Sequence, residues 1–275
     1  MESQPPHPHP SPPSPEGPPR RNLLWPLVAG AVALTLLVAA GGVTAWLLFI
    51  AERPGGGESV EFRLGNGQDP VPAEDVDLVS AVLHRRVVDL AAGEPAITVQ
   101  GDTALTVEFP PDTDVAEATA LLERPGVMAV HPVLGAAVSP DDGDTVLPVP
   151  STSELLRVGP AGLGNAQVAS AGFEHNPSYG QWEVQIEFTG EGAGTWATMT
   201  GEAACQSPGD PRRRLAIVVD EEIVSAPEVT PDVVCGVGLD VGATVVTGGF
   251  ERTEAAVLAT LVGSDPLPVA VTAVP

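Results

Sequence analysis

The residues of this 275-residue chain that could carry chemistry are few and far apart in sequence. His84 falls in a helical pattern, His131 precedes Pro132 at the end of a strand-like run, and His175 falls in a loop. No serine or cysteine stands in a motif that would make it a nucleophile. We therefore predict that the chain is not an enzyme and has no catalytic residues.

Two acidic clusters, Asp141–Asp144 and Asp220–Glu222, could attract a divalent cation through carboxylate oxygens. The first lacks the remaining positions of an EF-hand loop, so a solvated loop is the better interpretation. The glycine-rich segment 159–164 lacks the Lys-Ser/Thr pair of a phosphate loop, and we interpret it as a turn-rich connection. The sequence therefore predicts no metal site and no cofactor.

The chain has two cysteines, Cys205 and Cys235. In an oxidising compartment, a single pair of this kind is most simply a disulfide. Two buried free thiols are the alternative. A metal site is disfavoured, because neither cysteine has a second Cys or His at ligand spacing.

The charge balance of 12 Lys+Arg against 36 Asp+Glu gives a net charge of -24. Such a surface repels nucleic acid and disfavours tight association with anionic lipid headgroups. The simplest role of this acidity is solubility. The partners that it allows are polypeptides and neutral or cationic ligands.

One apolar run, residues 23–50, contains no charged residue and begins after Arg20 and Arg21. Trp25 and Trp46 lie near its two ends, where aromatic rings favour the headgroup region. We predict a single transmembrane helix in the cytoplasmic membrane, with the N-terminus inside and the C-terminal part outside. A cleaved signal peptide ending at Val38–Ala40 is the competing interpretation.

The segments on either side of this run have compositions that cannot form a core. Residues 1–22 are rich in proline, which is typical of an extended, disordered cytoplasmic tail. Residues 51–58 contain Pro54–Gly57 and predict a flexible tether.

A regular α+β pattern begins at Ser59. It predicts a strand at 59–64, a helix with apolar residues from Val76 to Leu90, a hairpin of 96–100 and 104–109, a helix from Asp114 to Leu122, and a closing strand at 127–133. The order βαββαβ is that of a ferredoxin-like unit, which we place at 59–137. The polar segment 138–152 is then a linker.

Residues 153–275 predict a second α+β unit. Apolar and polar residues alternate over 182–188, and helical patterns cover 191–204 and 253–262. Further strands are expected at 215–219, 223–225, 244–247 and 267–274.

Several strings in this order resemble the first extracytoplasmic (P1) region of SecD, an accessory subunit of the bacterial Sec export machinery. The residues that carry the resemblance are Glu187, Phe188, Thr189, Glu191, Gly192, Ala193, Asp220, Ser225, Ala226, Pro227, Gly248, Gly249, Phe250, Leu267 and Pro268. Each string is weak alone, but their order and spacing are specific. His84–Val87 and Gly93–Pro95 resemble the membrane-proximal base of the same region.

The resemblance implies a ferredoxin-like base, a SecD P1-head-like domain at 153–275, and a strand within 266–275 that returns to the base. Two departures stand against it. Glu221 and Glu222 occupy a turn where SecD proteins typically have Gly-Lys, and the glycine-rich aspartate motif of SecD is not recognisable at 59–69. The chain also ends at Pro275, before the further membrane helices of SecD, so we expect no proton-driven motor in it.

Two functions from different classes follow from these observations. The leading hypothesis is a membrane-anchored extracytoplasmic module that binds exported polypeptides or Sec translocase subunits. The alternative is an envelope structural or sensory domain that has the fold without a role in export, because fold alone does not fix function.

Overall fold

A computed structural model of the chain describes residues 57–275, apart from 92, 141–144 and 151. The predicted tail, the predicted membrane helix and most of the predicted tether fall on residues 1–56 and lie outside the described residues, as does the acidic cluster Asp141–Asp144. Among the helices that are described, none is both long and apolar enough to span a membrane.

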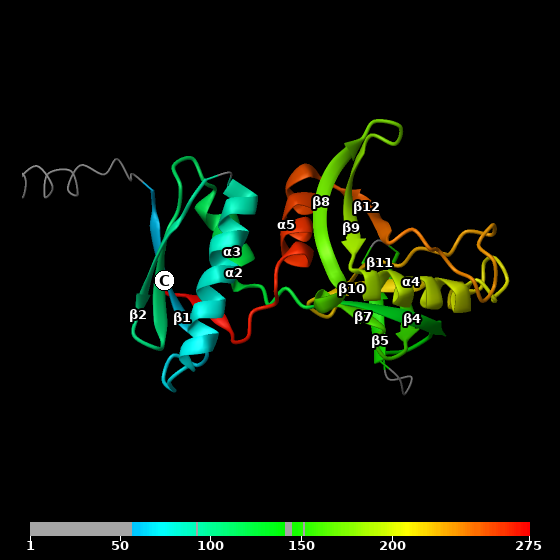
Figure 1. Cartoon of the computed structure of the whole chain (residues 1–275), viewed down its shortest axis with the longest axis horizontal. Coiled ribbons are helices and arrows are strands. Elements are labelled where there is room, and N and C mark those ends of the chain that lie inside the picture. The colour runs from blue at the N-terminus through cyan, green and yellow to red at the C-terminus, as the bar shows by residue number, and fades with distance from the viewer. Residues whose placement is uncertain (1–56, 92, 141–144, 151) are drawn as a thin grey trace, which may run out of the picture. The chain divides into compact units, whose positions relative to one another are not determined.

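The first unit, which we call the base, is a four-stranded antiparallel sheet with two helices packed on one face (Figure 1). Its elements are β1 (Ser59–Leu64), α2 (Ala73–Ala91), β2 (Ala96–Gln100), β3 (Ala104–Glu108), α3 (Val115–Glu123) and β13 (Val271–Ala273). The strand order β13-β1-β3-β2 is that of a ferredoxin-like unit. The predicted α+β class and βαββαβ order of the base are confirmed.

The helices of the base form where the sequence signals predict them. Val76, Val79 and Leu83 recur on one face of α2 and are buried against the sheet. The side chain of Asp114 accepts a hydrogen bond from the backbone N–H of Glu117 and so caps α3. This helix ends before Pro125, because proline disfavours helical backbone in the residue that precedes it.

The strand that closes the base sheet is not the one predicted. Residues 127–133 were expected to close it, but β4 (Met128–Ala137) pairs with β10 and β6 in a different sheet. The closing strand is β13, whose Ala273 lies opposite Phe62 of β1. The prediction failed because pairing between strands 200 residues apart leaves no local signal, while the apolar run of β4 fits either sheet.

The second unit, which we call the head, contains two sheets and two long helices. Its elements are β4, β5 (Thr145–Val149), β6 (Glu154–Val158), β7 (Leu163–Gly164), the 3₁₀ turn η1 (Asn165–Gln167), β8 (Val168–Asn176), β9 (Gln181–Phe188), α4 (Gly190–Ala203), η2 (Pro211–Arg213), β10 (Leu215–Val219), β11 (Glu222–Ser225), β12 (Ala243–Phe250) and α5 (Arg252–Gly263). One sheet has the order β11-β10-β4-β6-β5, with β7 also paired to β4, and the other has the order β12-β9-β8.

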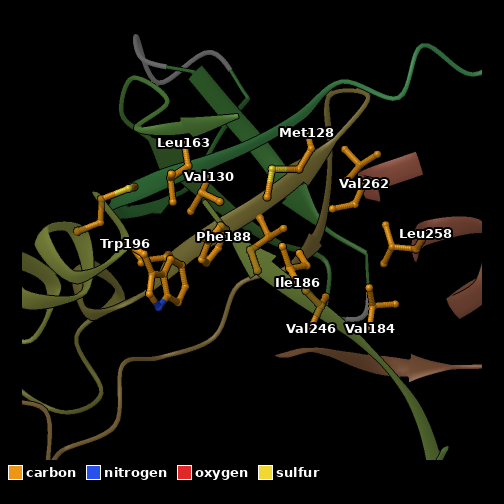
Figure 2. Packing of buried hydrophobic residues seen from close by; sticks show 14 of the residues in the cluster. Met128, Val130, Leu163, Val184, Ile186, Phe188, Trp196, Val246, Leu258 and Val262 are labelled. Atoms are coloured by element: carbon orange, nitrogen blue, oxygen red, sulfur yellow. The ribbon is translucent and has the colours of Figure 1, made fainter. Parts of the chain in front are cut away.

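The main core of the head lies between these two sheets. Figure 2 shows Met128 and Val130 of β4 packed near Ile186 and Phe188 of β9, with Leu258 and Val262 of α5 closing one side. All of these side chains are buried. Because β4 contributes to this core, its residues belong to the head.

The predicted linker 138–152 is also corrected. It contains β5, which pairs with β6 along its whole length, so this segment lies within a head sheet. Pro148 interrupts the strand signal in the sequence, and it is tolerated because β5 is an edge strand. The chain instead passes between base and head at 124–127, after α3, and again at 264–270, after α5.

The C-terminal strand returns to the base, as the resemblance implied, but it is shorter than predicted. Residues 267–274 were expected to be extended throughout, whereas β13 covers Val271–Ala273. Pro266 and Pro268 precede it and cannot donate backbone hydrogen bonds to a ladder.

Candidate functional site

A groove of about 800 Å³ lies on the head, beside Glu117 of α3 of the base. Its walls come from the end of β5, from β11 and the residues after it, from β12, from the first turns of α5, and from α3. The lining residues are Glu117, Arg124, Val149, Pro150, Thr152, Arg214, Glu222, Ile223, Val224, Ser225, Ala226, Pro227, Thr247, Gly248, Phe250, Thr253, Glu254, Val257 and Leu258.

Two sheet edges border this groove. Among the described residues, β11 forms a ladder with β10 alone and β12 with β9 alone, so each strand has one side without a hydrogen-bonded partner strand. The two edges approach each other where the hydroxyl of Ser225 donates to the backbone carbonyl of Thr247 at 3.0 Å. An edge strand offers backbone N–H and C=O groups to another extended chain.

The side chains of the groove combine an apolar wall with an excess of carboxylates. Val224, Phe250 and Val257 are half-buried and supply apolar surface. Both arginines of the lining are held by acids outside it, since Arg124 lies 2.9 Å from Asp220 and Arg214 lies 2.7 Å from Glu154.

Three glutamates of the lining, Glu117, Glu222 and Glu254, have no ion-pair partner among the described residues. The potential of the groove is therefore negative, and it favours cationic groups over anionic ones.

The structure divides the predicted motif residues among three places. Five of them, Ser225, Ala226, Pro227, Gly248 and Phe250, line the groove. Gly249 follows at the irregularity of β12, with φ of 72°, a left-handed conformation that favours glycine.

A second group, Glu187 to Ala193, forms the entrance to α4. The hydroxyl of Thr189 accepts the backbone N–H of Gly192 at 3.1 Å and caps the helix. A Cβ on Gly192 would lie 2.5 Å from the carbonyl oxygen of Gln167, so a side chain would force the helix away from η1. These residues shape the fold of the head and do not line the groove.

The third group, Asp220, Leu267 and Pro268, lies where the chain passes between head and base. Asp220 and Glu221 form the tight turn between β10 and β11, with φ of 49° and 69°. The carboxylate of Asp220 accepts from Arg124 and from the backbone N–H of Val127 at 2.8 Å. This carboxylate is therefore occupied by protein donors, and the turn is not an open cation site.

The three histidines that could carry chemistry lie apart from one another and from the groove. The Nε2 atom of His84 lies 2.8 Å from a carboxylate oxygen of Glu94 on the surface of the base, and the Nδ1 atom of His131 lies 2.8 Å from the carbonyl oxygen of Gly159. His175 lies edge-on to Trp182. Within the described residues, no three His, Cys, Asp or Glu side chains are grouped so that they could hold a metal ion.

The predicted disulfide between Cys205 and Cys235 is present, with a Cα–Cα distance of 4.5 Å. It joins the end of α4 to the loop before β12. Next to it, the backbone N–H of Gly236 donates to the carbonyl of Gly201, and the N–H of Leu239 donates to the hydroxyl of Thr200. The loop is thus fixed to α4 by covalent and hydrogen bonds together.

Sequence reasoning missed Glu117 and Arg124 as groove residues, and it missed the role of Arg86. Glu117 comes from α3 of the base and Arg124 from the residue that follows this helix, and nothing local places either of them in one groove with β11. Arg86 did leave a signal, because it falls on the same helical face as Val79, Leu83 and Leu90, where a charged residue is unexpected.

Comparisons with known proteins agree with this geometry. Residues 146–269 match the family model of the SecDF P1 head subdomain. The SecD protein translocase subunit of Acetobacter pasteurianus is 26% identical over 193 residues, covering 68% of this chain and 34% of the relative. That of Leptotrichia buccalis is 28% identical over 214 residues, covering 78% and 44%. The chain carries a SecD P1-like region.

Solved structures support the same fold for this P1-like region. The crystal structure of SecDF in its super-membrane-facing form aligns with a TM-score of 0.58 at 23% identity, over 92% of this chain and 35% of that chain. A structure of SecDF, described as a membrane component that enhances protein export, aligns with a TM-score of 0.56 at 23% identity, over 79% and 98%. The matched part spans 14 to 47% of the length of these and the other SecD relatives, so the chain corresponds to less than half of each.

Proposed function

We propose that this protein is an extracytoplasmic accessory module of protein export, and that the groove of its head binds extended segments of exported polypeptides. The relatives named protein translocase subunit SecD and the SecDF structure described as enhancing protein export favour this class of function. The observation that carries the proposal is the groove itself, which lies between two strands that each have an unpaired edge.

The groove suits an unfolded chain for a physical reason. An extended segment can add as a strand to β11 or β12 through main-chain hydrogen bonds, which do not depend on its sequence. Its alternate side chains would then contact the apolar surface of Val224, Phe250 and Val257. Binding of this kind is general, as a module that handles many exported polypeptides requires.

The charge of the groove adds a preference. With Glu117, Glu222 and Glu254 unpaired among the described residues, segments that carry Lys or Arg are favoured. These carboxylates lie near solvent, so the preference weakens as salt screens it. We expect weak, reversible capture, with no covalent step and therefore no enzymatic role.

The proposal includes attachment to the cytoplasmic membrane through residues 23–50, with residues 51–275 outside. The absence of charge in this run and the Arg pair before it support this orientation. External protease on intact spheroplasts should digest the outer part. Protection of that part would contradict the orientation.

Site-specific photo-crosslinking in living cells tests the binding role with the full chain. A crosslinker at Glu222 or at Thr247 faces the groove, and both positions should capture exported chains. Gln185 on β9 and Thr195 on α4 do not line the groove and serve as matched controls. Capture of exported chains at all four positions alike would contradict a specific site.

A charge variant sharpens this test. E117Q together with E222Q should reduce capture of basic segments at low salt, whereas E191Q, an exposed position on α4 away from the groove, should leave it unchanged. If neither groove position captures exported chains or a Sec subunit, the envelope structural or sensory alternative replaces the export role.

A further inference from the structure

The side chain of Arg86 is fully buried, although it comes from a helix of the base and carries a charge. Its Nη1 atom donates to the carbonyl oxygen of Arg124 at 2.5 Å, and its Nη2 atom donates to that of Pro125 at 3.0 Å. Its Nε atom donates to the hydroxyl of Ser264 at 3.2 Å. One guanidinium therefore holds both segments that pass between base and head.

Two residues of the head, Asn165 and Asp220, also form hydrogen bonds to these connecting segments. Asn165 donates to the carbonyl oxygen of Gly126 at 2.9 Å and to that of Ser264 at 3.4 Å, and its Oδ1 atom accepts the N–H of Met128 at 2.8 Å. Asp220 holds the first segment through Arg124 and Val127, as described above. The polar groups that hold the segments thus come from both units.

The two segments are also bonded to each other, since the N–H of Leu267 donates to the carbonyl oxygen of Pro125 at 2.9 Å. Gly126 makes the close approach possible. Its φ is 77°, and a Cβ there would lie 2.2 Å from Nη2 of Arg86. The glycine leaves the space that the guanidinium fills.

The burial of the Arg86 side chain means that its charged guanidinium depends on hydrogen-bond acceptors within the protein. Desolvation lowers the pKa of Arg86 to about 10, and the nearby charge of Asp220 opposes that effect. The group stays charged at neutral pH, so its donors need acceptors, and the carbonyls of the two segments provide them. If the side chain were shortened, the carbonyl oxygen of Arg124 would lose this donor, whereas that of Pro125 would keep only the N–H of Leu267.

We propose that Arg86, Asn165 and Asp220 form a lock that fixes the orientation of the head on the base, with Arg86 as its central positioning residue. Because Glu117 of α3 and Arg124, which follows this helix, form part of the groove wall, the same lock sets the width of the groove. The sequence predicted a linker at 138–152, whereas the two connections between base and head, at 124–127 and 264–270, are held by these contacts. This inference goes beyond the proposed function, since it is tested without any bound polypeptide.

Distance measurements between spin labels on the full-length protein test the lock. Labels are attached to cysteines introduced at Thr98 on β2 of the base and Thr198 on α4 of the head, both exposed, with the native disulfide left intact. We expect one narrow distance distribution in the parent protein and its loss in R86Q. The matched control is R85Q, because the neighbouring Arg85 is exposed and bonds only to Asp89, one turn along its own helix.

Each result of the distance measurement either supports or contradicts the lock. A broad distribution in the parent protein, or a narrow and unchanged one in R86Q, would overturn the lock. If R86Q does not fold, D220A is measured in its place. This substitution removes the carboxylate that accepts hydrogen bonds from Arg124 and Val127, and it leaves the buried Arg86 intact. A narrow, unchanged distribution in D220A would then overturn the proposal, and a broadened one would support it.

Discussion

The base and the head both have edge strands with one unpaired side, but only edge strands of the head line the groove. In the base, β13 joins β1 from far along the chain and completes a four-stranded sheet over one apolar core. In the head, β11 and β12 keep one free edge each, and these edges border the groove. The groove that we propose as a binding surface is therefore formed mainly by the head, with Glu117 of the base at one side.

The two units also differ in how their loops are restrained. In the base, β2 and β3 are joined by a short turn at Gly101, which has φ of 71°. The head has a long segment between β11 and β12, and the Cys205–Cys235 bond and its neighbouring hydrogen bonds fix it to α4. A unit with open edges and long loops needs such restraint if its groove is to keep a defined shape.

The largest expected effect is the loss of stability of the base when a side chain of its apolar core is shortened. Phe62 of β1 is fully buried, so F62A should destabilise the base by about 3–5 kcal/mol through lost burial and a cavity. Urea unfolding followed by circular dichroism measures this change. Y179A, at a residue that is 75% exposed in the hairpin of the head, serves as control and should change stability by less than about 0.5 kcal/mol. Similar effects from both variants would contradict the assigned core.

The next effect concerns the head and its disulfide. Replacing both cysteines, as C205A with C235A, frees a loop with a sequence separation of 30, for which chain entropy predicts a loss of about 3–4 kcal/mol. Fluorescence of the buried Trp196 reports unfolding of the head. S207A, at an exposed residue near the bond, is the control. Mass spectrometry of the untreated protein should find no free thiol, and ready alkylation of both cysteines would refute the bond.

Helix caps provide a matched pair across the two units. D114A removes the cap of α3 in the base, and T189A removes that of α4 in the head. Each should cost about 1 kcal/mol in urea unfolding, because one backbone N–H loses its acceptor. D114N and T189S retain an acceptor and should recover most of the loss. A much larger loss of unfolding free energy at one cap than at the other would show that the two units also differ in how far their stability depends on a helix cap.

The smallest effect is a titration on the surface of the head. The side chain and backbone of Arg212 donate to Asp210 and lower the pKa of that carboxyl from 3.8 to about 2. Since the folded pKa lies below the unfolded value, the contribution to stability is present above pH 3.8 and is lost as pH falls toward about 2. Carbon NMR of the Asp210 carboxyl measures it, and R212Q should return the pKa toward its ordinary value. An unshifted Asp210 in the parent protein would contradict the contact.

Local signals in the sequence were sufficient for most single elements. The spacing of Val76, Val79 and Leu83 determined α2, and the alternation from Trp182 to Phe188 determined β9. Asp114 marked the start of α3, and the two cysteines determined their own pairing because each had no other possible partner in the chain. In each case the cause lies within a few residues or in the composition of the whole chain.

Weakly patterned strands and long-range pairings were decided only by the tertiary structure. β8 has small and polar residues along its length, and it is a strand because β9 pairs with it and α5 covers it. The sequence of β4 is compatible with a strand of either unit. Only its position between β10 and β6 and its burial in the core of the head assign it to the head. Pairing free energy depends on which strands meet in space, and local sequence does not carry that information.

The residues of the groove and of the lock show most clearly which features the sequence determines and which ones only the tertiary structure decides. The sequence supplied Ser225, Pro227 and Phe250 as a pattern, but their shared surface with Glu117 exists only because α3 lies beside β11 in the folded chain. It supplied an arginine on the apolar face of α2, but the acceptors of that charge come from the segment after α3 and from the returning chain at Ser264 and Asp265. Composition and periodicity determined which residues are buried, whereas their partners follow from chain connections more than 100 residues long, which are settled by packing of the whole protein.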